Sequence, residues 1–283
     1  MAVKDLRSKK VLITGAGSGI GRATALTVAE AGAELFLTDI DADGLAETVT
    51  TVGKLGGTVA YAAPFDVSDY DAVVTFANDV HAEFGSMDVV MNVAGISAWG
   101  TVENLEHKYW KAMVDVNLMG PIHIIETFVP PMIDAGRGGH LVNVSSAAGL
   151  LALPWHAAYS ASKFGLRGVS EVLRFDLKRH KIGVSLVVPG GVKTPLVNSV
   201  HIAGVDRDDP RVQKLQHRFE SRAVAPETVA AAIVTGMAKD QFLVYSSRDI
   251  RIGYWIARKF ALPYEFAMQK ANDQFSRLLR PRR

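Results

Sequence analysis

The sequence predicts an α/β domain in which a doubly wound, mostly parallel sheet is flanked by helices. Two observations lead to this prediction. Short apolar runs alternate with segments of helical length along most of the chain. These runs show no alternation of polar and apolar residues, as expected when helices cover both faces of a sheet. We expect strands at residues 10–14, 35–38, 59–63, 89–93, 140–144 and 184–188, and helical segments at 19–31, 42–55, 69–84 and 157–180.

The first two strands lead into distinctive turns. Strand 10–14 is followed by a glycine-rich turn and then by helix 19–31, whereas strand 35–38 is followed by an acidic segment in which Asp41 is expected to cap helix 42–55. Ligands of doubly wound sheets bind at the carboxyl ends of the strands, near the point where the strand order reverses. Candidate functional residues are therefore sought directly after each strand.

The strand at 140–144 lies within the segment 138–162, which contains no Asp, Glu, Lys or Arg. This segment is long enough to raise the question of a membrane span, but its Asn143, Pro154 and His156 favour a buried strand followed by an active-site loop. The basic residues at the amino terminus are not followed by a long apolar run, so we expect no signal peptide. We expect a cytoplasmic protein, with attachment to a membrane surface as the alternative.

The composition excludes several classes of protein. The chain has 283 residues, of which 48% are hydrophobic and 21% charged, and it has no cysteine. A disordered chain, disulfides, Cys-ligated zinc, iron–sulfur clusters and thiol nucleophiles are therefore excluded. The eight histidines show no spacing typical of a metal site, so we expect no metal.

The charge is unevenly distributed. The net charge is +2, and nine Lys and Arg against three Asp and Glu give +6 in residues 246–283, which leaves −4 for residues 1–245. A near-neutral body with a basic tail does not suit a dedicated nucleic-acid binder. We expect one catalytic domain, residues 1–247, and a carboxyl-terminal helical extension, residues 248–283, that is apolar and aromatic first and basic at its end.

The turn after the first strand reads Thr14-Gly15-Ala16-Gly17-Ser18-Gly19-Ile20-Gly21, with the spacing Gly-x3-Gly-x-Gly at 15, 19 and 21. Glycines let the backbone turn sharply and approach a pyrophosphate, and the free N–H groups at the start of the next helix attract its negative charge. A purely structural turn has a similar composition. The position between the first strand and its helix favours nucleotide binding.

Asp39 ends the second strand about twenty residues after the glycines, where a carboxylate binds the ribose hydroxyls of an adenosine. A carboxylate there repels a 2′-phosphate, and no Lys or Arg stands at Ser18 or Ile40 to bind one. We therefore expect NAD(H) as the cofactor rather than NADP(H). The alternative is that Asp39, like Asp41, only caps the next helix.

Tyr159 and Lys163 are four residues apart on one face of a predicted helix. The pair alone is weak evidence, but it follows a particular order of features. That order is the glycine turn, the acidic strand end, Asn92-Val93-Ala94-Gly95, Asn117, Ser145-Ser146, the Tyr/Lys helix and Pro189-Gly190. In these features, over residues 9–244, the sequence resembles the classical short-chain dehydrogenase/reductase family. The resemblance implies a Rossmann-type fold in a single domain.

The resemblance also implies roles for individual residues. It implies a catalytic set of Asn117, Ser146, Tyr159 and Lys163, with Ser146 favoured over Ser145 because it lies thirteen residues before Tyr159. The pair Asp66-Val67 resembles the segment that contacts adenine, and Pro189 to Thr194 resembles the segment that cradles the nicotinamide. In the segment after the fourth strand, Val93 stands where the family has a second Asn. The expected cofactor-binding residues are Gly15, Ser18, Gly19, Ile20, Gly21, Asp39, Asp66, Val67, Asn92, Ala94, Gly95, Tyr159, Lys163, Pro189, Gly190, Val192 and Thr194.

The expected chemistry is proton transfer beside a nicotinamide. Interconversion of an alcohol and a ketone needs a group that gives a proton to the substrate oxygen or takes one from it. Free tyrosine has a pKa of about 10, and we expect the Lys163 ammonium and the charge of oxidised nicotinamide to lower the pKa of Tyr159. Ser146 would donate to the same substrate oxygen, and Lys163 would also bind the nicotinamide ribose. The resemblance implies that Asn117 holds a water linking Lys163 to solvent.

The substrate is less well defined. Trp99, Leu153, Trp155 and Val197 are candidates for an apolar pocket, with core or interface positions as the alternative, and His156 is a candidate substrate contact beside Ser146. We expect the segment 194–225 to form a mobile substrate lid, with a permanently ordered loop as the alternative. Three roles compete for the extension, namely a subunit contact, a cover over the substrate entrance and a membrane-surface anchor.

These inferences predict an NAD(H)-dependent oxidoreductase that interconverts a secondary alcohol and a ketone. The substrate is expected to be a hydrophobic small molecule, and the protein is expected to be a homo-oligomer, either a dimer or a tetramer. One alternative is a 3-oxoacyl-thioester reductase, against which Asp39 speaks because NADPH is the usual cofactor of that reaction. The other is a nucleotide-sensing protein without turnover.

Overall fold

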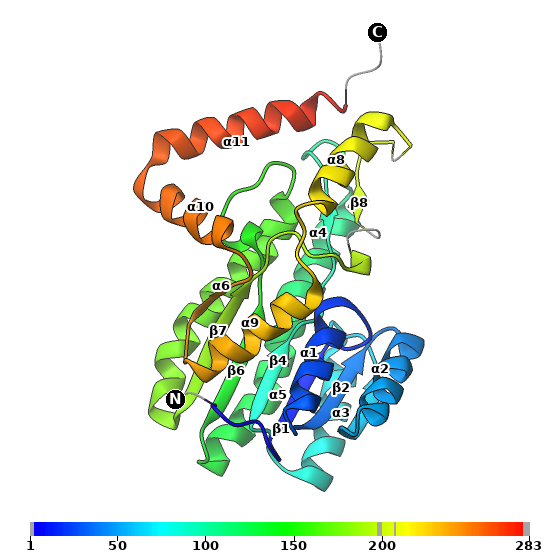
Figure 1. Cartoon of the computed structure of the whole chain (residues 1–283), viewed down its shortest axis with the longest axis vertical. Coiled ribbons are helices and arrows are strands. Elements are labelled where there is room, and N and C mark those ends of the chain that lie inside the picture. The colour runs from blue at the N-terminus through cyan, green and yellow to red at the C-terminus, as the bar shows by residue number, and fades with distance from the viewer. Residues whose placement is uncertain (1–2, 197–199, 207, 280–283) are drawn as a thin grey trace.

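A parallel sheet with the strand order β3-β2-β1-β4-β6-β7-β9 organises the fold (Figure 1). The computed structural model describes residues 3–196, 200–206 and 208–279, and the seven strands are counted within them. Their bounds are β1 Lys10–Thr14, β2 Glu34–Asp39, β3 Thr58–Pro64, β4 Val89–Asn92, β6 Gly139–Val144, β7 Ile182–Val188 and β9 Leu243–Tyr245. The six predicted strands are confirmed, with ends that shift by two residues or fewer. The short strand β9 was not predicted.

Helices cover both faces of the sheet, as the sequence predicts. On one face lie α1 Gly19–Glu30, α2 Ala42–Lys54 and α9 Pro226–Ala238, and on the other lie α3 Tyr70–Phe84, α5 Gly120–Ala135 and α6 Ala157–Asp176. Asp41 caps α2, because its Oδ1 accepts a hydrogen bond from the N–H of Gly44 at 3.1 Å. The architecture is therefore the doubly wound, Rossmann-like single domain that the sequence predicts.

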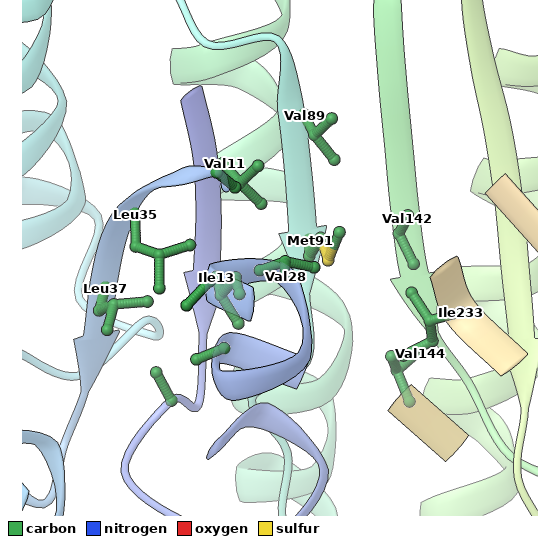
Figure 2. Close-up of a cluster of buried hydrophobic side chains, with 14 of the residues drawn as sticks. Val11, Ile13, Val28, Leu35, Leu37, Val89, Met91, Val142, Val144 and Ile233 are labelled. Carbon is green, nitrogen blue, oxygen red and sulfur yellow. The ribbon is translucent and has the colours of Figure 1, made fainter. Parts of the chain in front are cut away.

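Successive residues of each strand point to opposite faces, so each strand contributes to two apolar clusters. Val11 and Ile13 of β1 belong to the cluster beneath α1 and α9, whereas Leu12 belongs to the cluster beneath α3 and α5. Figure 2 shows the first cluster, with Val28 of α1 and Ile233 of α9 reaching the strand side chains. This two-sided burial explains why the strands are apolar without alternation.

A long helical stretch precedes β6 and consists of α4 His107–Val114, a π-helical turn Asp115–Met119 and α5. In the described part of the chain it is one helical stretch, 107–135, that is long and apolar enough to span a membrane. Its side chains Ile124, Phe128 and Met132 are buried in the cluster on the α3 side of the sheet. It is therefore explained as a core helix. The uncharged segment 138–162 is the predicted buried strand, β6, followed by a loop.

The chain from residue 194 to 225 carries short elements beside the carboxyl edge of the sheet. The strand β8 His201–Ile202 pairs with β5 Ala98–Trp99, and α8 Pro210–Glu220 follows. The predicted movement of this segment as a lid stays a prediction, and Val197 lies outside the described residues. The extension forms two helices, α10 Arg248–Lys259 and α11 Ala261–Ser276, which lie above the carboxyl edge of the sheet in Figure 1.

Candidate active site

A cleft opens at the carboxyl ends of β1 and β4, where the strand order reverses. β1 pairs with β2 on one side and with β4 on the other, so the connections leave in opposite directions and make room above the strands. Two cavities of about 210 and about 370 Å³ lie here. They lie side by side, because they share the wall residues Ile20, Val93, Gly95, Thr194 and Leu196.

The glycine turn lines the smaller cavity and leaves no space for side chains. A Cβ on Gly15 would lie 2.7 Å from the Cα of Ala94, and a Cβ on Gly21 would lie 1.8 Å from the carbonyl oxygen of Gly15. Gly15 and Gly19 have φ angles of +69° and +51°, in the left-handed region that favours glycine. Gly15 and Gly21 are therefore required for the close packing of the turn against Ala94 and against itself.

The start of α1 faces the same space. Ser18 stands at its N-cap position but makes no side-chain capping bond, so the first N–H groups of α1 are left for another acceptor. Thr14 holds the opposite wall, because its Oγ1 accepts hydrogen bonds from the N–H groups of Val93 and Ala94 at 3.0 and 3.1 Å. A glycine cradle and a helix start of this kind fit the pyrophosphate of a dinucleotide.

Asp39 lies at the edge of this cavity with its carboxylate directed at the glycine turn. Its Oδ2 accepts a hydrogen bond from the N–H of Gly17 at 2.7 Å, and its Oδ1 accepts one from the N–H of Asp41 at 2.9 Å. The carboxylate does not cap α2, a role taken by Asp41. Arg22, a cation beside this turn, donates to the carbonyl oxygen of Gly17 and to Glu47.

Tyr159, Lys163 and Ser146 meet in the wall of the larger cavity. Tyr159 and Lys163 come from the first two turns of α6, and Lys163 Nζ lies 5.8 Å from the centre of the Tyr159 ring. Lys163 is only 4% exposed, and its Nζ donates to the carbonyl oxygen of Val144 at 3.0 Å. Ser146 follows β6 and hydrogen-bonds the Tyr159 phenol, whereas Ser145 Oγ donates to the carbonyl oxygen of Lys163.

The protein surroundings shift both ionisable groups away from their charged forms. Burial raises the pKa of Tyr159 above its ordinary value of 10.0, and the hydrogen bond with Ser146 opposes that rise. Burial also lowers the pKa of Lys163 from 10.5 to about 8. The expectation that the Lys163 ammonium and oxidised nicotinamide together lower the pKa of Tyr159 stays a prediction.

Asn117 lies next to Lys163 but does not line either cavity. It sits in the π-helical turn, is fully buried, and its Oδ1 accepts from the N–H of Ile96 while its Nδ2 donates to the carbonyl oxygen of Ile96, both at 2.9 Å. A Cβ on Gly95 would lie 3.0 Å from Asn117 Oδ1 and 3.4 Å from Lys163 Nζ. Asn117 and Lys163 therefore approach the same glycine. Wide π-helical turns often occur at functional sites.

Comparison with known proteins identifies the family. The short chain dehydrogenase family model matches residues 9–203. This chain belongs to the short-chain dehydrogenase family. SadH of Mycobacterium tuberculosis is 38% identical over 267 residues, which cover 93% of this chain and 95% of SadH.

Solved structures of short-chain dehydrogenases share the fold. A Burkholderia phymatum short-chain dehydrogenase in complex with NAD is 29% identical with a TM-score of 0.80, and the match covers 89% of this chain and 93% of that one. A metagenomic short-chain oxidoreductase in complex with NADP is also 29% identical, with a TM-score of 0.68 and coverage of 85% and 96%. Structures of both kinds therefore resemble this chain.

Most of the predicted cofactor residues line the cleft of this short-chain dehydrogenase. The smaller cavity is lined by Gly15, Ser18, Gly19, Ile20, Gly21, Asp39, Asp66, Val67, Ala94, Gly95 and Thr194. The larger is lined by Pro189, Gly190, Val192 and Thr194, together with Tyr159 and Lys163. Asn92 differs from its neighbours, because it is buried beneath the cleft, lines neither cavity and donates from Nδ2 to Asn143 Oδ1 at 2.9 Å.

The predicted substrate residues Ser146, Leu153, His156 and Trp99 all line the larger cavity. Trp155 does not, since its ring is buried against Phe275 of α11 with ring centres 5.4 Å apart. Of the two alternatives for Trp155, the structure therefore shows the core position.

Several wall residues of the larger cavity escaped sequence reasoning, among them Asp249 and Ile250 at the start of α10. Their position depends on how the extension folds back over the sheet, for which the local sequence gives no signal. The extension is anchored near the site through Tyr264, whose hydroxyl accepts a hydrogen bond from the N–H of Ala152 at 2.7 Å. The loop before α6 and the extension thus form one side of the cavity.

Proposed function

We propose that this short-chain dehydrogenase interconverts a secondary alcohol and the matching ketone with NAD(H). The observation that supports this most strongly is the meeting of Tyr159, Ser146 and the buried Lys163 in the wall of a cleft whose other end is the glycine cradle beside Asp39. The family is shared with oxidoreductases. The cofactor preference, the role of each residue and the substrate are our proposals.

The cradle would hold the pyrophosphate, Asp39 the adenosine ribose hydroxyls, and Asp66 and Val67 the adenine end. Lys163 would bind the nicotinamide ribose, and the segment from Pro189 to Thr194 would hold the nicotinamide ring. When bound, the nicotinamide supplies the hydride chemistry, which belongs to the cofactor. Because relatives bind NAD or NADP, the preference for NAD(H) rests on the Asp39 carboxylate, which would repel a 2′-phosphate.

The protein groups would move the proton. In oxidation, Tyr159 would take the proton of the substrate hydroxyl, and in reduction it would give one to the developing alkoxide. Ser146 would donate to the same oxygen and hold it in place. The Lys163 ammonium would stabilise the phenolate once it forms, and Asn117 would order the path by which the proton reaches solvent.

The substrate would carry an apolar body. Leu151, Leu153, Leu196, Val200 and Ile250 line the larger cavity and would remove such a body from water. The extension would cover this cavity, since Asp249 and Ile250 belong to its wall. Removing residues 248–283 should then raise KM for apolar substrates. An unchanged KM together with a smaller assembly in solution would instead favour a subunit contact.

A homo-oligomer is also proposed. Phe164, Val172 and Phe175 of α6 are exposed apolar side chains, and a subunit contact would bury them. The mass in solution, measured by light scattering, should be that of a dimer or tetramer. A monomer at micromolar concentration would contradict this.

The reaction is tested by following NAD⁺ reduction at 340 nm with secondary alcohols of increasing size, beside NADP⁺ and the variant Tyr159→Phe. We expect turnover with NAD⁺, loss of turnover in Tyr159→Phe and unchanged NADH binding by that variant. Activity on 3-oxoacyl thioesters with NADPH would favour the reductase alternative. NADH binding without turnover of any substrate would favour a sensor, and full activity of Tyr159→Phe would refute the mechanism.

A further inference from the structure

The turn that enters α6 is strained. Trp155 has a φ of +66°, which is a costly conformation for a bulky side chain. Its surroundings hold it there: the N–H of Gly100 donates to the carbonyl oxygen of Trp155 at 2.9 Å, and the indole is buried against Phe275. Strain of this kind persists only where the surrounding structure over-determines the conformation, and it clusters at active sites and ligand clamps. The side chain placed by this turn is His156.

The hydrogen bonding of His156 determines its tautomer. Its Nδ1 lies 2.7 Å from the carbonyl oxygen of Pro154. A carbonyl can only accept, so Nδ1 carries the proton and Nε2 carries a lone pair. Burial lowers the pKa of His156, which keeps the ring neutral. Among the described residues, none donates a hydrogen bond to Nε2.

His156 lies beside the reacting group. Its ring is tilted against Trp99 with centres 4.5 Å apart, and its centre lies 6.3 Å from that of the Tyr159 ring. Both rings line the larger cavity. The Trp99 indole N–H donates to Ser97 Oγ at 2.8 Å, so Trp99 covers one face of the imidazole without donating to it.

We propose that His156 is a specificity-determining residue whose Nε2 accepts a hydrogen bond from a second hydroxyl of the substrate, close to the carbon that is oxidised. The substrate class is then a diol, or the hydroxyketone made from it, on an otherwise apolar chain. This inference rests on the proposed function. An alcohol without the second hydroxyl would not supply the donor that Nε2 accepts, and a site built to hydrogen-bond a substrate hydroxyl discriminates against an analogue that lacks it.

Matched substrates test this assignment. Octane-2,3-diol is compared with octan-2-ol and octan-3-ol, which share its chain and lack one hydroxyl. We expect kcat/KM of the unaltered protein to be about 10- to 100-fold higher for the diol. The variant His156→Phe keeps a ring against Trp99 and should lose this preference, whereas His156→Gln, which retains an acceptor, should keep part of it. His107→Phe, on the exposed start of α4, is the control and should change kcat/KM neither for the diol nor for the octanols.

A merely structural role for His156 would lower kcat/KM for the diol and the octanols by the same factor, and that result would overturn the proposal. Equal rates on the diol and the octanols in the unaltered protein would also overturn it. If none of these alcohols is oxidised, the proposed function fails at this point. A second measurement then keeps the assignment of His156 testable by itself.

Long-range ¹H–¹⁵N spectra of the free protein report the tautomer directly. We expect one signal, absent in His156→Gln, of a neutral histidine protonated at Nδ1, and we expect octane-2,3-diol to shift the Nε2 resonance more than octan-2-ol does. A proton on Nε2, or equal shifts with the diol and octan-2-ol, would overturn the proposal whatever the enzyme turns over.

Discussion

Replacing Lys163 by Met should stabilise the protein while it removes activity. The ammonium of Lys163 is only 4% exposed, and its pKa falls from 10.5 to about 8 because burial disfavours the charge. A lowered lysine pKa means that folding is penalised wherever the group is charged. The penalty is complete below pH 8 and is relieved as the pH rises from the folded value towards the unfolded one.

The shift sets the size of the effect. A fall from 10.5 to about 8 corresponds to about 3 kcal/mol at pH 7. Lys163→Met also leaves the carbonyl oxygen of Val144 without its donor, which costs about 1 kcal/mol. We therefore expect a net gain of about 2 kcal/mol in the free energy of unfolding at pH 7. By pH 10 the gain should fall to about zero, because most of the penalty has disappeared from the unaltered protein.

Urea unfolding followed by circular dichroism, without added NAD(H), measures the difference between the two proteins at each pH. Lys54→Met is the matched control, since Lys54 is exposed at the end of α2. It should change stability by less than about 0.5 kcal/mol at both pH values. A Lys163→Met protein that is less stable at pH 7, or whose gain does not change with pH, would refute the view that Lys163 is a desolvated cation.

Further predictions concern the cofactor, acid stability and the glycine turn. Replacing Asp39 by Asn and Ile40 by Arg should lower kcat/KM for NAD⁺ by about tenfold or more and raise kcat/KM for NADP⁺. An unchanged ratio of kcat/KM for NAD⁺ to kcat/KM for NADP⁺ would show that Asp39 does not face the ribose. Burial lowers the pKa of His140 from 6.5 to about 4, so the unfolded chain takes up the proton first and stability falls as the pH drops from 6.5 to 4. The free energy of unfolding should fall by about 3 kcal/mol because of His140, and the total fall, measured by urea unfolding across that range, should be smaller in His140→Gln. An equal fall in both proteins would show that other groups cause the acid sensitivity. Gly21→Ala places a Cβ 1.8 Å from the carbonyl oxygen of Gly15, so the turn must open. The affinity for NADH, measured by fluorescence titration, should then fall by more than about tenfold. An unchanged affinity would show that the glycine turn does not bind the cofactor.

Residues that stand in recognisable short sequence patterns were predictable, whereas residues that reach the site only because the extension folds back over the sheet were not. The strands were found because Val11 and Ile13 are buried on one face and Leu12 on the other, which leaves a continuous apolar run. The glycine turn was found because its glycines lie close together in the sequence, and Gly21 is required by the space within the turn itself.

The remaining features depend on contacts across the chain. Asp249 and Ile250 reach the cavity wall only because α10 folds back over the sheet, and the bond from Ala152 to Tyr264 joins residues 112 positions apart. The short strand β9, with three residues, is too brief for its pattern to stand out from a loop.

The central claim is that this cleft moves a hydride from the carbinol carbon of a secondary alcohol to NAD⁺ while Tyr159 takes the hydroxyl proton. The most direct measurement uses an alcohol that carries deuterium at its carbinol carbon and determines by mass spectrometry where the deuterium goes. We predict that each NADH formed contains one deuterium, and that Tyr159→Phe forms none although it still binds NADH. Release of the deuterium to water, or unlabelled NADH, would contradict the account.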